Sequence, residues 1–324
     1  MREPDFWNGH DNTARLAIAA LAPLSWAYGA TVAYKAAHAK PYRSSAKVIC
    51  VGNLSAGGTG KTPVSIAITR ALIERGYSPA ILTRGYGGRE RGPLVVNSER
   101  DQATRIGDEA LVLAAAAPVI VSRDRAAGAK LAEREAINAI VMDDGHQNFT
   151  LAKDLSIVVV DAATGFGNGH VLPAGPLREP IGAGLARAHA MVVVGEGPFM
   201  PAKFGKPVLR AQLVPVDVVG LSGRAVVAFA GIGRPEKFFE TLEKLGATLI
   251  ETRAFPDHHI YTAAEVARLK ATARGKDALL MTTEKDFVRL TTAERQDMRY
   301  LPVRAAFEDP AALTALLDTV APSR

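Results

Sequence analysis

The segment GNLSAGGTGKTP, at positions 52–63, decides the fold of this 324-residue chain. It follows the apolar run AKVICV, which predicts a buried strand, and it leads into a helix predicted from Lys61 to Arg75. Glycines let backbone amides converge on phosphate oxygens, and a helix N-terminus adds partial positive charge. We therefore predict a P-loop in which Lys61 reaches the terminal phosphates and Thr62 offers its hydroxyl to Mg²⁺. Its nucleotide-binding residues are Ser55, Ala56, Gly57, Gly58, Thr59, Gly60, Lys61 and Thr62.

One position departs from the usual pattern, G-x-x-x-x-G-K-[ST]. Ser55 stands where that pattern has its first glycine, while Gly57, Gly58 and Gly60 still supply a flexible backbone. A plain glycine turn before a lysine is the competing interpretation. The strand-loop-helix context favours the P-loop.

A P-loop needs a carboxylate partner for magnesium, commonly at the end of a neighbouring apolar strand. The run AIVMDDG, at 139–145, provides Asp143 and Asp144. A strand-ending Asp-Gly turn is the alternative. The pattern leaves open which aspartate meets the metal. Bound ATP with Mg²⁺ is the expectation.

The order of apolar and amphipathic runs predicts an α/β protein. Short apolar strands alternate with helices from residue 45 to 220, which indicates a P-loop NTPase-like parallel sheet with helices on both faces. The stretch 162–180 is rich in Gly and Pro, and so long a loop in a compact domain is usually functional. The pattern restarts near Leu221, so we expect a second, smaller α/β domain over 221–324.

The first 44 residues predict a membrane-associated helix. Nineteen uncharged residues lie between Arg15 and Lys35, and they include Trp26 and Tyr28. Aromatic residues and flanking basic residues favour an interfacial amphipathic helix over a span. An ordinary buried helix and a true transmembrane span are the alternatives.

Charge and composition narrow the partners. The net charge is +6 and the sequence pI is about 9.4, which favours acidic partners. Basic residues are scattered and only 6% of residues are aromatic, so nucleic-acid binding is weakly supported. With Cys50 as the one cysteine, the chain has no internal disulfide, which fits a reducing compartment.

Two other classes of P-loop protein are disfavoured, because this chain lacks their signature residues. Guanine-specific switches carry an Asn/Thr-Lys-x-Asp reader, and TEKDF at 283–287 does not supply it. ATPases that partition cargo carry a signature lysine where this chain has Ala56.

Seven motifs occur together in one order: VGNLSAGGTGKTP, LTRGYGG, GDEALVLA, MDDGHQN, LPAGPLREP, FPDHHIYT and TTEKD. With them the chain resembles the tetraacyldisaccharide 4'-kinase family of lipid A biosynthesis over nearly its whole length. The resemblance implies ATP-dependent phosphorylation of the 4'-hydroxyl of a tetraacylated glucosamine disaccharide 1-phosphate, giving lipid IVA. It also implies two α/β/α domains around a cleft and a helix docked on the cytoplasmic face of the bacterial inner membrane, with no obligate protein partner.

The resemblance also assigns catalytic roles. Asp108 looks like the base that takes the sugar hydroxyl proton, with His258 as its partner, while Glu179 looks like a magnesium ligand beside Asp144 and Thr62. Arg178 is similarly placed to meet the lipid phosphate or the transferred charge. Without the resemblance, Asp108 reads as a helix N-terminal acid, and the neighbours at 178 and 179 as a solvated ion pair.

Substrate and nucleotide contacts complete the implied site. Asn53, Arg84 and Tyr86 are expected at the substrate, and Gln147 at the nucleotide or magnesium. For the TRGYGG loop at 83–88, a plain glycine turn is an equally strong interpretation. Asn148 stands where the family more often has histidine, so no role is carried over to that position.

Two rival functions stay open at this point. One is a membrane-associated P-loop ATPase that drives a partner protein or cargo, and the other is a non-catalytic nucleotide-dependent scaffold. ADP release that depends on the lipid acceptor distinguishes a kinase from the first rival. Magnesium-dependent phosphate transfer excludes the second.

Overall fold

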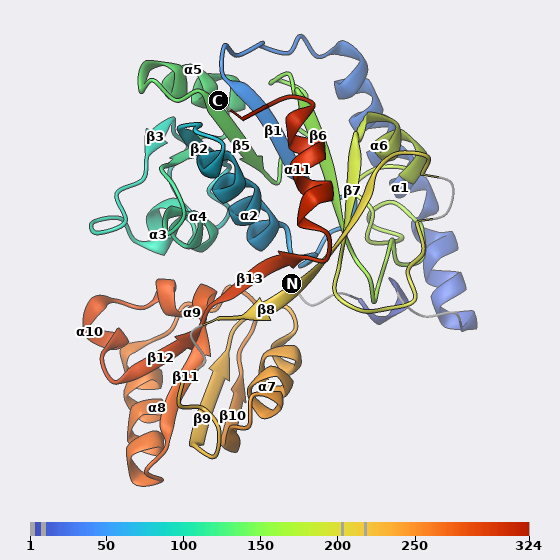
Figure 1. Ribbon diagram of the computed structural model, residues 1–324. Coiled ribbons are helices and arrows are strands. Elements are labelled where there is room, and N and C mark those ends of the chain that lie inside the picture. The colour runs from blue at the N-terminus through green and yellow to red at the C-terminus, as the bar shows by residue number, and fades with distance from the viewer. Residues whose placement is uncertain (1–3, 8–10, 202–203, 217–218, 324) are drawn as a thin grey trace.

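The chain folds around two sheets, one of nine strands and one of four. The computed structural model describes residues 4–7, 11–201, 204–216 and 219–323. The larger sheet has the order β13-β8-β7-β6-β1-β5-β2-β4-β3, and the smaller one β10-β9-β11-β12. Figure 1 shows the larger domain above the smaller one, with β8 and β13 at their junction.

The larger sheet is parallel except at its two edges, where β3 pairs antiparallel with β4 and β13 pairs antiparallel with β8. The P-loop strand β1 lies between β5 and β6, so the carboxyl ends of these three strands share one edge of the sheet. The strands are β1 (Lys47–Gly52), β2 (Pro79–Thr83), β3 (Leu94–Val95), β4 (Val119–Val121), β5 (Ala139–Asp143), β6 (Leu155–Asp161), β7 (Ala190–Val194), β8 (Val208–Pro215) and β13 (Val303–Phe307).

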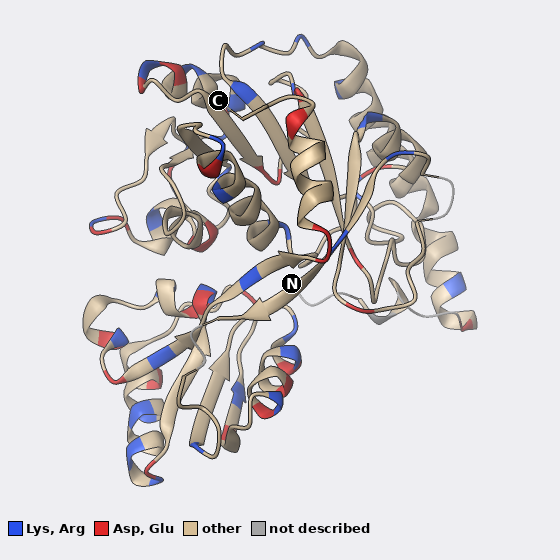
Figure 2. Ribbon diagram, viewed as in Figure 1, with Lys and Arg blue, Asp and Glu red and all other residues tan. Residues whose placement is uncertain are grey.

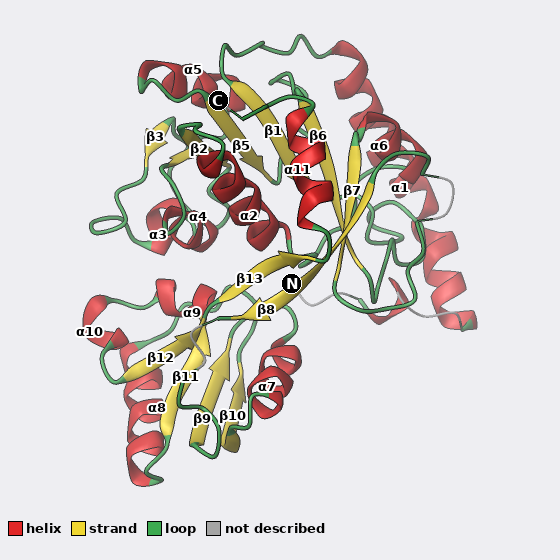
Figure 3. Ribbon diagram, viewed as in Figure 1, coloured by secondary structure: helices red, strands yellow, loops and turns green. Residues whose placement is uncertain are grey.

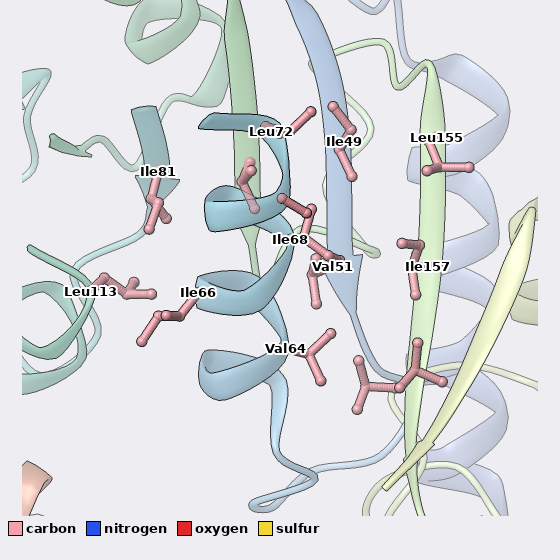
Figure 4. Close-up of a cluster of buried hydrophobic side chains, with 14 of the residues drawn as sticks. Ile49, Val51, Val64, Ile66, Ile68, Leu72, Ile81, Leu113, Leu155 and Ile157 are labelled. Atoms are coloured by element: carbon pink, nitrogen blue, oxygen red, sulfur yellow. The ribbon is translucent and has the colours of Figure 1, made fainter. Parts of the chain in front are cut away.

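Helices cover both faces of this sheet, as predicted. On one face α2 (Lys61–Glu74), α4 (Asp108–Ala114) and α11 (Pro310–Asp318) enclose the largest apolar cluster. Figure 4 shows side chains of α2, among them Ile68, meeting Ile49 and Val51 of β1. The other face is covered by α5 (Arg125–Arg134) and α6 (Ile181–Arg187), and the short α3 (Ala103–Ile106) precedes α4. Burial of the apolar face of α2 therefore sets the position of the P-loop at its N-terminus.

The smaller sheet is wholly parallel and is packed by its own helices. Two separate apolar clusters lie on its two faces. Its elements are β9 (Ala225–Ala230), α7 (Pro235–Lys244), β10 (Thr248–Ala254), α8 (Ala263–Gly275), β11 (Leu279–Thr283), α9 (Glu284–Arg289), α10 (Thr292–Arg295) and β12 (Met298–Leu301).

The end of the chain differs from the predicted division at 221–324. Residues 303–307 form β13, which pairs with β8 of the larger sheet (Figure 3). Helix α11 packs with its Leu313, Leu316 and Leu317 in the core of the larger domain. These leucines recur at helical spacing, which predicts a buried face without saying in which domain it is buried. The smaller domain is therefore an insertion between β8 and β13.

The N-terminal helix α1 (Asn12–His38) lies along the side of the larger domain, preceded by the short η1 (Asp5–Trp7). It is long and apolar enough to cross a bilayer, and only 6% of an 18-residue apolar stretch within it is buried against the rest of the protein. Trp26 is 75% exposed and Leu16 is 72% exposed. Figure 2 shows that the middle of α1 carries no charged residue, whereas charges are spread over the helices of the smaller domain.

Candidate active site

The P-loop is shaped by glycine backbone conformations. Gly57 and Gly60 have φ of 109° and 85°, which L-residues with a side chain rarely adopt. Gly60 is the N-cap of α2, and no side chain caps the first amides of that helix. Such amides are donors for an anion. Ser55, the departure from the motif, is not among the described non-glycine residues with positive φ, so its side chain is compatible with the loop.

The Gly- and Pro-rich stretch 162–180 docks directly on the P-loop. The amide of Ala56 donates to the Pro176 carbonyl at 2.7 Å, and the amide of Arg178 donates to the Leu54 carbonyl at 2.7 Å. Ser55 and Leu177 form an antiparallel bridge. These backbone bonds place Arg178 and Glu179 beside the phosphate-binding loop. The Gly- and Pro-rich sequence of 162–180 does not by itself predict this position.

Asp144 lies between two cations. Its Oδ1 is 3.8 Å from Lys61 Nζ, and Arg178 Nη1 donates to both of its oxygens at 2.8 and 2.9 Å. Burial works against its charge, but the positive charges of Lys61 and Arg178 outweigh it and hold the pKa of Asp144 at about 2. Its backbone has φ of 49°, a costly conformation that often occurs at functional sites.

Asp143 faces the core instead. It is 1% exposed and accepts a hydrogen bond from Ser65 Oγ at 2.7 Å. Burial, together with the charge of Glu109, raises the pKa of Asp143 to about 6. Of the two aspartates, Asp144 is thus the more acidic one, and it is the one beside the P-loop lysine.

The side chain of Glu179 already has partners in this structure. It is 1% exposed, its Oε1 accepts from Gln147 Nε2 at 2.9 Å, and its Oε2 accepts from Arg187 Nη2 at 2.5 Å. Within the described ranges, no group of three or more His, Cys, Asp and Glu side chains is arranged to hold a metal ion. The predicted set of Thr62, Asp144 and Glu179 combines one hydroxyl with two carboxylates, so it is a different kind of group and stays a prediction.

Asn53 and Gln147 support the P-loop from beneath. Asn53 is fully buried, and its Nδ2 donates to Thr59 Oγ1 at 3.2 Å. Gln147 Nε2 donates to the Asn53 carbonyl at 2.9 Å as well as to Glu179. The buried Oδ1 of Asn53 has no partner among the described residues. Hydrogen bonds from Gln147 to the Asn53 backbone and from the Asn53 side chain to Thr59 therefore link the loop after β5 to the P-loop.

Asp108 and His258 come together across the two domains, 150 positions apart in the chain. Asp108 begins α4 in the larger domain, and His258 lies in the loop between β10 and α8 of the smaller domain. His258 Nδ1 is 3.0 Å from Asp108 Oδ2. Asp108 is 4% exposed, whereas the His258 side chain is 32% exposed. The predicted acid-histidine pair is thus present, with the histidine on its open side.

Charge at this junction favours the ionised pair. Burial alone would raise the pKa of Asp108, but the hydrogen bond from His258 and the charge of Arg289 outweigh it and leave that pKa far below the usual range. The hydrogen bond to Asp108 raises the pKa of His258. His258 has φ of 58°, so its loop is held in a costly conformation to reach this position.

The TRGYGG loop borders the same junction. Arg84 and Tyr86 are both exposed, and the Tyr86 ring centroid is 5.4 Å from that of His258. Adding a Cβ to Gly85 or Gly88 would bring it to 2.6 Å from its nearest neighbour, so the glycines also serve the turn. The close contacts support the turn interpretation, and the substrate contacts of Arg84 and Tyr86 stay a prediction.

No motif marks Arg289, and the TTEKD motif leaves Lys285 as either a structural ion pair or a nucleotide contact. Lys285 Nζ pairs with Glu109 Oε1 at 2.6 Å across the domains, and Arg289 contacts Asp108. Both lie on α9, where i,i+4 spacing predicts a shared face. No local pattern predicts that this face of α9 packs against the larger domain.

A P-loop domain with an inserted α/β domain, whose junction holds a carboxylate-histidine pair, has the parts that a nucleotide-dependent phosphotransferase needs. The family model for tetraacyldisaccharide-1-P 4'-kinase (LpxK) matches residues 17–321. This chain therefore belongs to that family, and it is a kinase.

Individual relatives agree with this assignment. The tetraacyldisaccharide 4'-kinase of Paramagnetospirillum magneticum is 50% identical over 99% of both chains, and that of Dinoroseobacter shibae is 48% identical over 100% of this chain and 98% of its own. Among solved structures, the "apo" form of LpxK from Aquifex aeolicus in complex with ATP superposes with a TM-score of 0.75 at 27% identity. It covers 94% of this chain and 99% of its own. ATP binding is thus supported by a structural relative.

Proposed function

We propose that this protein transfers the γ-phosphoryl group of ATP to the 4'-hydroxyl of a tetraacylated glucosamine disaccharide 1-phosphate. The observation that carries the proposal is the Asp108–His258 pair, which forms where the two domains meet, while the P-loop lies between β1 and α2 of the larger domain. An acceptor hydroxyl needs a proton acceptor at such a junction, whereas nucleotide binding alone does not.

Each side chain has a distinct task in this reaction. Lys61 and the P-loop amides bind the phosphates and stabilise the charge that develops on the transferred group. Asp108 keeps the acceptor hydroxyl in place and takes its proton. Because the transition state of phosphoryl transfer is loose, positioning by an ionised carboxylate matters more than base strength. Arg178 and Arg84 offer positive charge to the phosphates of either substrate.

Asp144 and Thr62 fit a magnesium ion. Mg²⁺ is usually held by one or two carboxylates together with substrate phosphates, and Asp144 is ionised beside the P-loop. When bound there, the ion would neutralise charge on the β- and γ-phosphates. Arg178 contacts both oxygens of Asp144, but the Asp144 side chain is 32% exposed. Glu179 fits less directly, because it is 1% exposed and its oxygens contact Gln147 and Arg187.

We further propose that the protein binds peripherally to the cytoplasmic face of the bacterial inner membrane through α1. The exposed Leu16, Leu24, Trp26 and Tyr34 give the helix an apolar surface with an aromatic component. An acylated acceptor is insoluble, so an enzyme that phosphorylates its headgroup gains from lying on the bilayer. The first 44 residues then act as an anchoring segment.

The rival function of an ATPase that drives a partner or cargo makes a different prediction for Asp108. ATP hydrolysis would then proceed without lipid, and the pair at the junction would be a structural contact. The membership of the chain in a kinase family argues against this rival.

The experiment is mass spectrometry of the tetraacylated disaccharide 1-phosphate after incubation with ATP, Mg²⁺ and the protein. We expect the lipid to gain one phosphate. Asp108→Asn should lower this transfer by about 10²-fold or more, the contribution typical of a general base, while ATP binding persists. ATP hydrolysis without any change in the mass of the lipid would contradict the proposal.

A further inference from the structure

The carboxylate of Asp108 is held mainly by the smaller domain. From its own domain it receives, among the described residues, one hydrogen bond, from the amide of Glu109 to Oδ1 at 2.8 Å. Its Oδ2 accepts from Arg289 Nε at 2.7 Å and Nη2 at 2.5 Å, in addition to the contact with His258. Two residues of the smaller domain therefore determine where this oxygen lies.

Arg289 has no room to contact a substrate. Its side chain is 6% exposed, and its remaining terminal nitrogen, Nη1, donates to the Gly231 carbonyl and to Asp286 Oδ1, both at 2.7 Å. Four of the five N–H donors of the planar guanidinium are therefore directed at three partners, Asp108, Gly231 and Asp286. Any effect it has on the reaction is exerted through Asp108.

A second buried carboxylate fixes Arg289 in turn. Asp286 is fully buried, and it accepts hydrogen bonds from the Gly231 amide at 3.0 Å, the Tyr261 hydroxyl at 2.8 Å and the Thr283 hydroxyl at 2.6 Å. The chain from Thr283 through Asp286 and Arg289 to Asp108 is thus a continuous, satisfied network. It begins in the core of the smaller domain and ends at the proposed base of the larger one.

We propose that Arg289 is a positioning residue for phosphoryl transfer. It keeps Asp108 ionised and oriented while the two domains are together, so that the smaller domain completes the proton acceptor of the larger one. This inference rests on the proposed function, because it assumes that Asp108 takes the proton of the acceptor.

The charges around the pair determine in which direction the pKa values of Asp108 and His258 should move when Arg289 is removed. Asp108 is faced by His258, Arg289 and Lys285, with Glu109 next to it, and His258 is faced by Asp108, Asp257 and Arg289. Without Arg289, burial would favour the protonated form of Asp108. The positive charge of Arg289 also lowers the pKa of His258, so its removal has an opposite, upward effect there.

The first test measures kcat against pH for Arg289→Gln and Arg289→Lys with ATP and the lipid acceptor. For Arg289→Gln we expect kcat to fall by about 10- to 100-fold and the acid limb of the profile to move to higher pH, with KM for ATP within about twofold of wild type. Arg289→Lys keeps the charge and loses the planar fork, so its acid limb should stay near that of wild type.

Arg295→Gln is the matched control. Arg295 also belongs to the smaller domain and caps carbonyls of α9, those of Phe287 and Val288, without contacting Asp108. It should leave kcat and the pH profile unchanged. A wild-type pH profile for Arg289→Gln would overturn the proposal. So would a fall in kcat that Arg295→Gln shows to the same extent, or one accompanied by an equal rise in KM for ATP.

The second test needs no lipid. NMR titration of the His258 ring should show its midpoint shifted upward in Arg289→Gln, unchanged in Arg295→Gln and shifted downward in Asp108→Asn. If wild-type protein failed to phosphorylate the lipid, the proposed function would fail while this titration still measured the link from Arg289 to the pair. An unchanged His258 midpoint in Arg289→Gln would refute that link.

Discussion

Two adjacent aspartates acquire different chemistry from their surroundings. Asp143 ends β5 and points to Ser65 in the core, whereas Asp144 has left the strand with a positive φ and faces Lys61 and Arg178. Burial keeps the pKa of Asp143 near 6, and the neighbouring cations keep that of Asp144 near 2. At neutral pH only Asp144 therefore combines full ionisation with access to the P-loop, which a DD pair in a sequence cannot reveal.

The pH dependence of stability should report the Asp108–His258 bond. The folded-state pKa of His258 is raised by that bond, so its stabilising effect is fully present below the unfolded pKa of about 6.5 and is lost as pH rises through the folded pKa. We therefore expect the free energy of unfolding to differ more between wild type and His258→Gln at about pH 6 than at about pH 9.

Urea titrations at several pH values measure this difference. His170→Gln, which removes an exposed histidine from the larger domain, is the control for the substitution itself. If the His258→Gln difference were equal at both ends of the range, the bond would not be formed in solution.

At the scale of elements, local patterns predicted most of the larger domain. The P-loop helix was expected at 61–75 and spans Lys61–Glu74, and α5 spans Arg125–Arg134. These elements carry their own signals, a glycine loop before one and Asp124 as N-cap before the other. The loop at 162–180 could be predicted as functional but not placed, because its docking on the P-loop depends on backbone bonds between segments over 100 residues apart.

The apolar surface of α1 leads to a prediction about membrane binding. Trp26 is 75% exposed, so Trp26→Glu should leave the fold intact while removing a side chain that the bilayer would bury. The loss of about 2 kcal/mol for one large apolar group corresponds to a fall of ten-fold or more in vesicle partitioning. Sedimentation with phospholipid vesicles measures it.

Val219→Glu is the control for that experiment, because Val219 is 85% exposed outside α1. It should partition like wild type. Equal binding of wild type and Trp26→Glu would mean that another surface meets the membrane, and resistance of the wild type to extraction at alkaline pH would identify α1 as a span.

At the scale of the whole molecule, the chain passes twice between the domains, once after β8 and once before β13. The second crossing is what the sequence could not show, since the apolar face of α11 would fit either core. Its contacts settle the matter: Arg75 Nη2 donates to the Thr314 carbonyl at 3.1 Å, and the Tyr77 hydroxyl donates to the Pro322 carbonyl at 3.2 Å. The end of the chain is thereby attached to the end of the P-loop helix α2.

This attachment predicts that a C-terminal substitution weakens the nucleotide site rather than the domain that precedes it in sequence. Leu317 is fully buried in the core of the larger domain, and Leu317→Ala should cost about 2–5 kcal/mol of stability by leaving a cavity. Amides of β1 and α2 should then exchange faster with deuterium, and ATP should bind more weakly, while β9 and β11 keep their protection. Leu242→Ala, which removes an equally buried leucine from the core of the smaller domain, should give the reverse pattern. Faster exchange confined to β9 and β11 in Leu317→Ala would return α11 to the smaller domain and contradict the insertion.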